Sequence, residues 1–265
     1  MSTKIQFSKY QGAGNDFVLI DNRKGLLQRR NDDLVKKLCD RRFGIGGDGL
    51  MLLQYTENFD FEMVYYNADG AEGTMCGNGG RCIVAFARDL NIINEKTDFL
   101  AVDGPHEAEI LADQVNLGMI DVHHVSRDGD AFVLNTGSPH YIEKVEGLKT
   151  MDVFKAGYTI RNNDTYGAQG INVNFIEAEG DGFFVRTFER GVEDETYACG
   201  TGATAAAMAM AIDQDLQGDI SIPVRVLGGQ LYISFHREGD SFTNVYLKGP
   251  ANFVFSGEIE IDEFI

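Results

Sequence analysis

The chain is poor in positive charge and has no long apolar run. It carries 23 Lys and Arg against 41 Asp and Glu, which gives a formal net charge of −18. Nucleic acid is therefore not expected as a main partner, because phosphate binding needs clustered basic side chains, and an anionic membrane surface is disfavoured too. The amino-terminal residues 1–7 lack the apolar core of a signal peptide, and no stretch approaches a membrane span. A cytoplasmic location is expected.

Cysteine is also scarce. The four cysteines lie at positions 39, 76, 82 and 199, and no pair forms Cys-x-x-Cys. A structural zinc site is therefore not expected, and in a reducing compartment disulfides are not expected either. Cys39 and Cys82 are interpreted as small core residues. We expect no metal.

Glycine-flanked cysteines, by contrast, occur twice in the same context. Residues 198–202 read Ala-Cys-Gly-Thr-Gly and precede a small, apolar run, and residues 75–80 read Met-Cys-Gly-Asn-Gly-Gly before a second apolar segment. Each stretch is typical of a turn that leads into a buried helix. Two such turns in a chain with four cysteines predict a duplicated unit that supplies one thiol from each copy.

The rest of the chain reads mainly as strands separated by glycine turns. Apolar runs at 17–20, 50–53, 61–66, 171–176 and 183–188, and most of 220–261, have strand character. Further helices are predicted to open at Asn31 or Asp32 and to cover 152–156. A change of pattern near 116–119 predicts the domain crossing. The expectation is α+β, with residues 1–115 plus 253–265 in one domain and 116–252 in the other, each a mixed sheet with one central helix.

A cysteine at the start of a helix faces unpaired N–H groups and the positive end of the helix dipole. Both favour thiolate over thiol, and the neighbouring glycines let a carboxylate approach the backbone. If the copies face each other, one thiolate removes a proton from a carbon and the opposing thiol delivers one to its other face. The pattern therefore predicts inversion at a carbon that bears hydrogen beside a carboxylate.

Five stretches in order resemble the diaminopimelate epimerase family. They are Gly-Ala-Gly-Asn-Asp-Phe at 12–17, Arg-Phe-Gly-Ile-Gly-Gly-Asp-Gly at 42–49, Asn-Ala-Asp-Gly at 67–70, Met-Cys-Gly-Asn-Gly-Gly-Arg-Cys at 75–82 and Ala-Cys-Gly-Thr-Gly-Ala at 198–203. The resemblance implies a pyridoxal-independent epimerase, with no cofactor, that converts LL- to meso-diaminopimelate for lysine and peptidoglycan synthesis. It also implies two pseudo-symmetric α/β domains, each a curled sheet around a central helix, with the site in the cleft between them.

The resemblance also implies roles for individual residues. Cys76 and Cys199 would be the acid/base pair, and Glu189 and His140 would bias their protonation. The groups that hold the carboxylate at the reacting carbon would be Gly77, Asn78, Gly200 and Thr201. The groups that fix the rest of the substrate would be Asn15, Asn67, Asn172, Glu189 and Arg190.

Three departures from the family pattern bear on substrate binding. Ser138 stands where the family usually has asparagine, so an amide contact is lost or replaced by a hydroxyl. Gly49 stands where some members carry a glutamine. The stretch 189–196 is one residue longer than usual, which could re-aim Glu189 or Cys199.

Two other readings remain. A proline or hydroxyproline racemase would use two cysteines, but those enzymes typically show histidine after the first Cys-Gly, where this chain has Asn78. A thiol redox sensor would need no substrate-binding set like the one above. The expected partner is a small amino-acid substrate, and the expected assembly is a homodimer.

Overall fold

The computed structural model describes residues 4–29 and 31–261; residues 1–3, 30 and 262–265, all in the predicted first domain, lie outside the described residues. The chain forms two compact units, Met1–Leu117 with Pro250–Ile265 (unit 1) and Gly118–Gly249 (unit 2). Among the described residues, no helix has the length and apolar character needed to cross a membrane.

Unit 1 is one mixed sheet with two helices. Its strands are β1 (Lys4–Gly12), β2 (Asn15–Asp21), β3 (Gly49–Gln54), β4 (Phe61–Asn67), β5 (Lys96–Ala101), β6 (Gly104–Leu111), β7 (Gln114–Gly118) and β17 (Asn252–Glu260), and its helices are α1 (Asp32–Cys39) and α2 (Gly77–Asp89). The strands pair in the order β17-β1-β2-β3-β4-β5-β6-β7. The pairs β2–β3 and β4–β5 are parallel, and the others are antiparallel.

Unit 2 is built in the same way. Its strands are β8 (Val125–Asp128), β9 (Ala131–Asn135), β10 (Pro139–Lys144), β11 (Asn172–Glu179), β12 (Gly182–Glu189), β13 (Asp194–Thr196), β14 (Gly218–Val226), β15 (Gly229–Glu238) and β16 (Ser241–Pro250). Its helices are η1 (Leu148–Thr150), α3 (Val153–Arg161) and α4 (Gly200–Asp213). The strands pair in the order β8-β9-β10-β11-β12-β14-β15-β16, and the short β13 pairs with β12.

The two sheets repeat one plan. Read along these orders, both have two antiparallel pairs, then a parallel, an antiparallel and a parallel pair, then two antiparallel pairs. The helices fall at matching places, because α1 and α3 each connect the first parallel pair, and α2 and α4 the second. This confirms the predicted α+β fold of two pseudo-symmetric halves, and it identifies the repeat of the cysteine motif as part of a whole-unit duplication.

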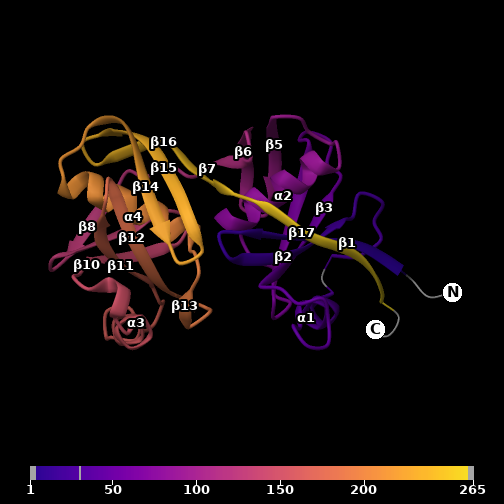
Figure 1. Ribbon diagram of the computed structural model, residues 1–265, viewed down its shortest axis with the longest axis horizontal. Coiled ribbons are helices and arrows are strands. Elements are labelled where there is room, and N and C mark those ends of the chain that lie inside the picture. The colour runs from indigo at the N-terminus through magenta and orange to yellow at the C-terminus, as the bar shows by residue number, and fades with distance from the viewer. Residues whose placement is uncertain (1–3, 30, 262–265) are drawn as a thin grey trace. The chain divides into compact units, whose positions relative to one another are not determined.

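Each unit buries one helix in the middle (Figure 1). The residues of α2 are buried from its first turn to Ala87, and those of α4 nearly throughout, from Gly202 to Ala211. A helix surrounded by protein has no polar face, which explains the small and apolar composition of α4; the buried part of α2 is also mostly small and apolar, but it contains Asn78 and Arg81. Strands with helices on both faces need no alternation of polar residues, hence the continuous apolar runs at 17–20 and 50–53.

The outer helices cover the other face of each sheet. On α1, the apolar side chains of Leu34, Val35 and Leu38 pack in one cluster with residues of β2 and β3. The predicted short helix at 152–156 is wrong in length, because α3 continues to Arg161. The extra turns are stabilised by the Phe188 ring, which meets Phe154 and Tyr158 with ring centroids 5.8 and 6.5 Å away.

Candidate functional site

The candidate residues gather at one end of each sheet. Asn15 opens β2 and Asn67 closes β4, and the antiparallel course of β4 brings both to the same end. In unit 2, Asn172 opens β11 beside His140, and Glu189 closes the antiparallel β12. The duplication therefore supplies two equivalent polar sheet ends, one per unit.

Both candidate cysteines cap a central helix, as predicted. Cys76 precedes α2 with φ −103° and ψ 129°, and Cys199 precedes α4 with φ −109° and ψ 111°. Neither sulfur is used to cap the N–H groups of its own helix. Since the first N–H groups of a helix have no partner within it, both turns can present donors to an anion beside a thiol. Cys199 is 7% exposed, and Cys76 is partly exposed.

A series of hydrogen bonds orients Asn78 and Asn15, two of the three candidate asparagines of unit 1. Arg81 Nη2 donates to Asn78 Oδ1 (3.0 Å), Asn78 Nδ2 to Asn15 Oδ1 (2.7 Å) and Asn15 Nδ2 to Asp48 Oδ2 (2.7 Å). Arg41 closes the series with a 2.7 Å ion pair to Asp48 Oδ1. The cation at one end and the carboxylate at the other fix which way each amide points.

Arg81, the cation that begins this series of hydrogen bonds, is fully buried. Arg81 has no exposed surface, and its guanidinium also donates to the carbonyls of Gly77 (3.1 Å) and Pro250 (3.3 Å). Burial lowers the pKa of Arg81, whereas the neighbouring thiols of Cys82 and Cys76 act in the opposite direction. A buried guanidinium stays charged, so this arrangement favours negative charge near the start of α2.

The place of the missing glutamine is occupied by an aromatic ring. A Cβ at Gly49 would lie 2.6 Å from Tyr65 Cε2 and 2.5 Å from the carbonyl oxygen of Tyr66, so a larger residue does not fit. The Tyr65 hydroxyl donates to Asn67 Oδ1 at 3.0 Å. Tyr65 therefore covers the end of the sheet beside Gly49 and orients Asn67, a candidate substrate-binding residue.

Ser138, the second departure, belongs to a polar cluster in unit 2. Asn172 Nδ2 donates to Ser138 Oγ (2.8 Å), and Arg190 Nη2 lies 3.4 Å from the same oxygen. Asn172 Oδ1 accepts from the backbone N–H of Arg190 at 2.8 Å. The serine hydroxyl thus joins two predicted binding residues, which gives the departure a structural role.

His140 reaches Cys199 through a hydroxyl. His140 is fully buried, its Nε2 lies 2.9 Å from Thr201 Oγ1, and that oxygen lies 3.4 Å from Cys199 Sγ. Burial, together with the charge of Arg190, lowers the pKa of His140 to about 3, so the ring is neutral at physiological pH. Cys199 therefore adjoins a neutral network.

The longer stretch at 189–196 is accommodated in a turn. Glu189 pairs with Asp194 at the end of the β12–β13 hairpin, and Glu193 in the turn takes φ 57°. Glu193 Oε1 accepts from the N–H of Gly191 at 3.0 Å, and Glu189 Oε2 accepts from Thr196 Oγ1 at 2.9 Å. The two strands next to the turn stay in register, with Phe188 opposite Glu195 and Thr187 opposite Thr196.

The other two cysteines are core residues, as predicted. Cys39 and Cys82 are 3% and 0% exposed. Burial raises the pKa of each thiol to about 12, so neither forms a thiolate near neutral pH.

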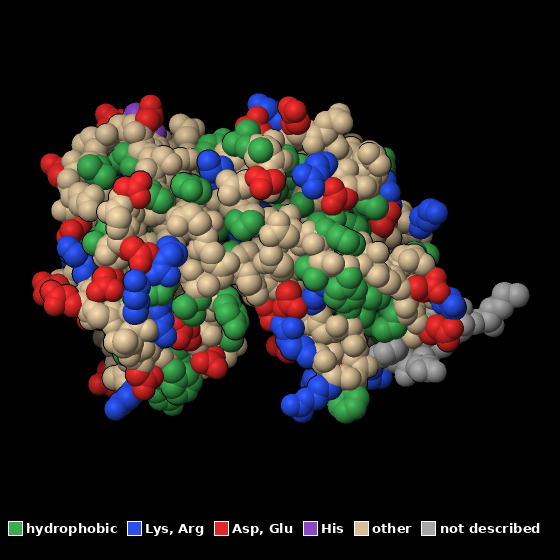
Figure 2. Space-filling view, in the orientation of Figure 1, with side chains coloured by type: hydrophobic (Ala, Val, Ile, Leu, Met, Phe, Trp, Pro, Cys, Tyr) green, Lys and Arg blue, Asp and Glu red, His purple; other side chains and the backbone are tan. Residues whose placement is uncertain are grey.

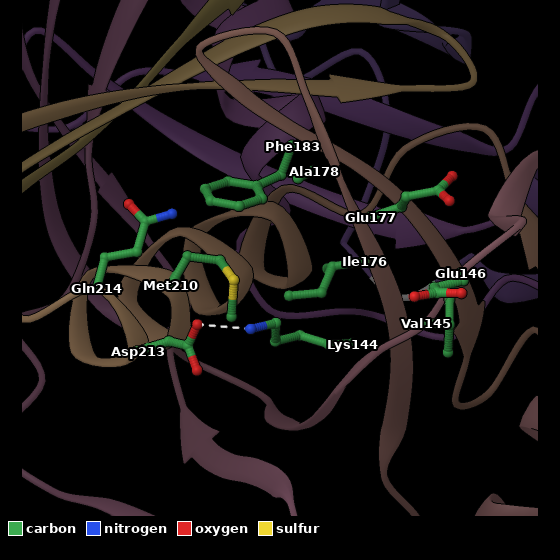
Figure 3. Close-up of a pocket in the computed structure, with 10 residues that line it drawn as sticks. All are labelled: Lys144, Val145, Glu146, Ile176, Glu177, Ala178, Phe183, Met210, Asp213 and Gln214. Carbon is green, nitrogen blue, oxygen red and sulfur yellow. Dashed lines mark hydrogen bonds and ion pairs between the residues drawn. The ribbon is translucent and has the colours of Figure 1, made fainter.

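A pocket elsewhere in unit 2 is unrelated to these residues (Figure 3). It measures about 270 Å³, and an ion pair of 2.6 Å joins Lys144 Nζ and Asp213 Oδ2 at its side. Lys144 ends β10, roughly 13 Å of strand beyond His140, and Asp213 ends α4, roughly 20 Å of helix beyond Cys199. The pocket therefore lies at the opposite end of the unit from the cysteine.

Sequence reasoning missed several polar residues that contact the candidates, among them Asp48, Arg81 and Asn174. Arg81 carried a signal, because it is a charged residue in the buried stretch from Gly77 to Ala87, which is otherwise small and apolar except for Asn78. Asn174 did too, since it lies two residues beyond Asn172 and thus on the same face of β11. Asp48 carried little, because its contact with Asn15 joins segments 33 residues apart.

Known proteins resemble this chain in sequence and in fold. The family described as diaminopimelate epimerase matches residues 7–125 and 132–254. A diaminopimelate epimerase of Flavobacterium psychrophilum is 51% identical over 257 residues, which cover 96% of this chain and 100% of that protein. One from Chlorobaculum tepidum is 43% identical and covers 94% of this chain and 99% of its own length.

Solved structures with much lower identity share the fold. A phenazine biosynthesis protein of the PhzF family from Bacillus anthracis has a TM-score of 0.76 at 14% identity, over 97% of this chain and 99% of that one. A hydroxyproline epimerase from Agrobacterium vitis has a TM-score of 0.73 at 14% identity, over 99% and 94%. These likenesses establish the fold alone, whereas the sequence matches establish more: the chain belongs to the diaminopimelate epimerase family.

Proposed function

We propose that this protein converts LL-diaminopimelate to meso-diaminopimelate without a cofactor, as a step towards lysine and peptidoglycan. The observation that carries the proposal is the pair of Cys-Gly helix starts, one in each repeated unit, with almost the same backbone angles. Full-length relatives named diaminopimelate epimerase support the substrate.

In the proposed reaction, Cys76 and Cys199 act on opposite faces of one α-carbon. One cysteine, as thiolate, takes the α-proton and becomes a thiol; the other gives its proton to the opposite face and becomes a thiolate. The number of protons is unchanged, and the pair exchanges roles for the reverse reaction. The N–H groups at the helix starts, at Gly77 and Asn78 and at Gly200 and Thr201, would hold the substrate carboxylate and stabilise the charge that develops on it.

The remaining candidates would hold the rest of the substrate. Asn15, Asn67, Asn172, Glu189 and Arg190 offer amide, carboxylate and guanidinium groups, which complement the ammonium and carboxylate of a second amino-acid centre. Their support is the gathering of the first two at the sheet end of unit 1 and of the other three at the sheet end of unit 2. Glu189 and His140 would also bias the protonation of the thiols.

The test is solvent exchange with reduced protein and no added cofactor. In deuterium oxide, LL-diaminopimelate should lose its α-hydrogen and appear as the meso isomer. Exchange with proline or hydroxyproline but none with diaminopimelate would reassign the protein to the racemase alternative. A protein with no exchange on any amino acid, but with a reversible Cys76–Cys199 disulfide, would point to the redox sensor.

We further infer a cytoplasmic homodimer. A chain with only four cysteines, of which Cys39 and Cys82 are buried in the core, suits a reducing compartment. Consecutive residues of β17, Phe253, Val254 and Phe255, are 54%, 52% and 44% exposed, and hydrophobic side chains gather over this strand in Figure 2. A second copy of the chain would cover such a patch. Sedimentation velocity at micromolar protein should give a dimer that Phe253→Asp converts to monomer.

A further inference from the structure

Asn174 is a buried polar residue to which no catalytic or binding role has been given. It lies on β11 with no exposed surface. Its Oδ1 accepts from Thr187 Oγ1 at 2.9 Å, while its Nδ2 donates to the carbonyl of Tyr141 at 3.1 Å and lies 3.1 Å from His140 Nδ1. Because a carbonyl oxygen can only accept, the contact with Tyr141 fixes which end of the amide is the NH₂ group.

This orientation determines where the proton of the histidine lies. The NH₂ group can only donate, so His140 Nδ1 must accept and carries no proton. The ring is neutral, as its pKa shows, so its single proton lies on Nε2. The Nε2–H then donates to Thr201 Oγ1 at 2.9 Å.

The hydroxyl of Thr201 is thereby left with its own proton. With the opposite tautomer, Nε2 would accept a hydrogen bond from the Thr201 hydroxyl; with this one, the hydroxyl can donate to Cys199 Sγ at 3.4 Å. A hydrogen bond from a neutral donor favours the charged form of the sulfur that accepts it. The network can therefore stabilise Cys199 whenever it is a thiolate.

We propose that Asn174 is a positioning residue that holds His140 in its Nε2–H tautomer, so that Thr201 can donate to the thiolate of Cys199. The inference rests on the proposed role of Cys199 as acid/base group. An independent observation joins Asn174 to the cysteine turn: a Cβ at Gly202 would lie 2.4 Å from Asn174 Oδ1 and 3.3 Å from Cys199 Sγ. The second glycine of the motif leaves room for this amide.

The first experiment needs no substitution at Asn174. Protein labelled with ¹⁵N in its histidines gives ring-nitrogen signals that distinguish the tautomers, and His140→Asn identifies the signals of His140. The expected result in the ligand-free protein is an unprotonated Nδ1 and a protonated Nε2. A protonated Nδ1 would overturn the inference, whatever the activity, whereas a lack of exchange with diaminopimelate would overturn only the proposed function.

The second experiment replaces the donor by an acceptor of the same shape. In Asn174→Asp the carboxylate accepts a hydrogen bond from an Nδ1–H group, so the single ring proton of His140 moves to Nδ1 and Nε2 accepts a hydrogen bond from the Thr201 hydroxyl. We expect kcat to fall about 10- to 100-fold in both reaction directions, with little change in KM, and the ¹⁵N signals to show a protonated Nδ1. The control Asn163→Asp makes the same change at an exposed turn whose Oδ1 accepts two backbone N–H groups, and it should behave as wild type.

Thr201→Val tests the hydrogen bond to Cys199 without changing any residue of β11. It removes the hydroxyl at similar volume but keeps the contact of Asn174 with His140. The inference requires that Nδ1 stays unprotonated and Nε2 stays protonated in this variant, together with a lowered kcat. Wild-type kcat in either Asn174→Asp or Thr201→Val would show that no proton needs to be directed to Cys199.

Discussion

The two units share a backbone plan but surround their cysteines with different charge. In unit 1 the start of α2 adjoins Arg81, a fully buried cation bound to neutral oxygens. In unit 2 the start of α4 adjoins His140, fully buried and neutral. The caps themselves differ by only 6° in φ and 18° in ψ. The two caps are therefore alike in backbone shape and differ in the charge of the fully buried side chain beside them.

The proposed reaction needs two like groups that begin with opposite protonation, and this difference would suit them. The buried Arg81 guanidinium favours negative charge near the start of α2. The neutral network around Cys199 carries no net charge, and the hydroxyl of Thr201 can accept from a thiol or donate to a thiolate. The two units thus repeat one backbone plan and place different buried side chains, Arg81 and His140, beside the starts of their central helices.

The largest expected effect follows from removing either thiol. Cys76→Ser and Cys199→Ser each replace an acidic sulfur by a hydroxyl that does not ionise near neutral pH, so epimerisation should fall at least about a thousandfold in both. Conversion of LL- to meso-diaminopimelate measures it, with Cys82→Ser as the matched control. Near-normal turnover in one of the two variants would mean that only one unit supplies a proton-transfer group.

Among the substitutions that test stability, we expect the largest loss in the free energy of unfolding at Arg81. Arg81→Met removes the donor to two carbonyls and to the amide oxygen of Asn78, and it should cost about 2–4 kcal/mol in the free energy of unfolding, measured in urea. Arg81→Lys keeps the charge and should recover part of this free energy. If Arg81→Met instead unfolded at the same urea concentration as wild type, the buried cation would not be needed for the frame of unit 1.

The sequence predicted the two central helices and their cysteine caps well, but it predicted the charges around those caps poorly. Glycine-flanked cysteines before apolar runs indicated both central helices and their caps, because these signals are local in sequence. The hydrogen bonds that charge or neutralise each half-site join distant segments, as between Asn78 and Asn15, which are 63 residues apart. The periodicity of apolar residues in a sequence does not predict hydrogen bonds between residues so far apart. The neutral state of His140 depends on complete burial, which a loop-like Ser-Pro-His stretch does not suggest.

Acid should affect the two units in different pH ranges. The pKa of His140 is lowered from 6.5 to about 3, so the unfolded chain binds a proton that the folded chain does not, and stability falls as pH decreases from about 6.5 to 3. For Asp16 in unit 1, burial alone would raise the pKa, but hydrogen bonds from Arg41 and Lys9 lower it to about 2. Its contribution is present above pH 4 and is lost as pH falls from about 4 to 2.

Two variants separate these ranges. Each titration contributes at most about 1.4 kcal/mol per pH unit within its own range. In urea unfolding at stepped pH, His140→Asn should flatten the dependence between pH 6.5 and 4, and Asp16→Asn should flatten it only below pH 4. The same flattening in both variants would contradict the assignment of separate groups.

The smallest effect is expected at the far end of unit 2, where the comparison is between two polar clusters of one unit. The ion pair of Lys144 with Asp213 has side chains 57% and 29% exposed, whereas His140, Asn174 and Cys199 lie in the interior. Lys144→Gln should change the free energy of unfolding by less than about 1 kcal/mol, because solvent screens an exposed pair, and should leave kcat and KM unchanged. A loss of turnover in this variant would show that the pocket beside Lys144 communicates with the cysteine at the other end of α4, and the chemistry could then no longer be assigned to the capped end of the helix alone.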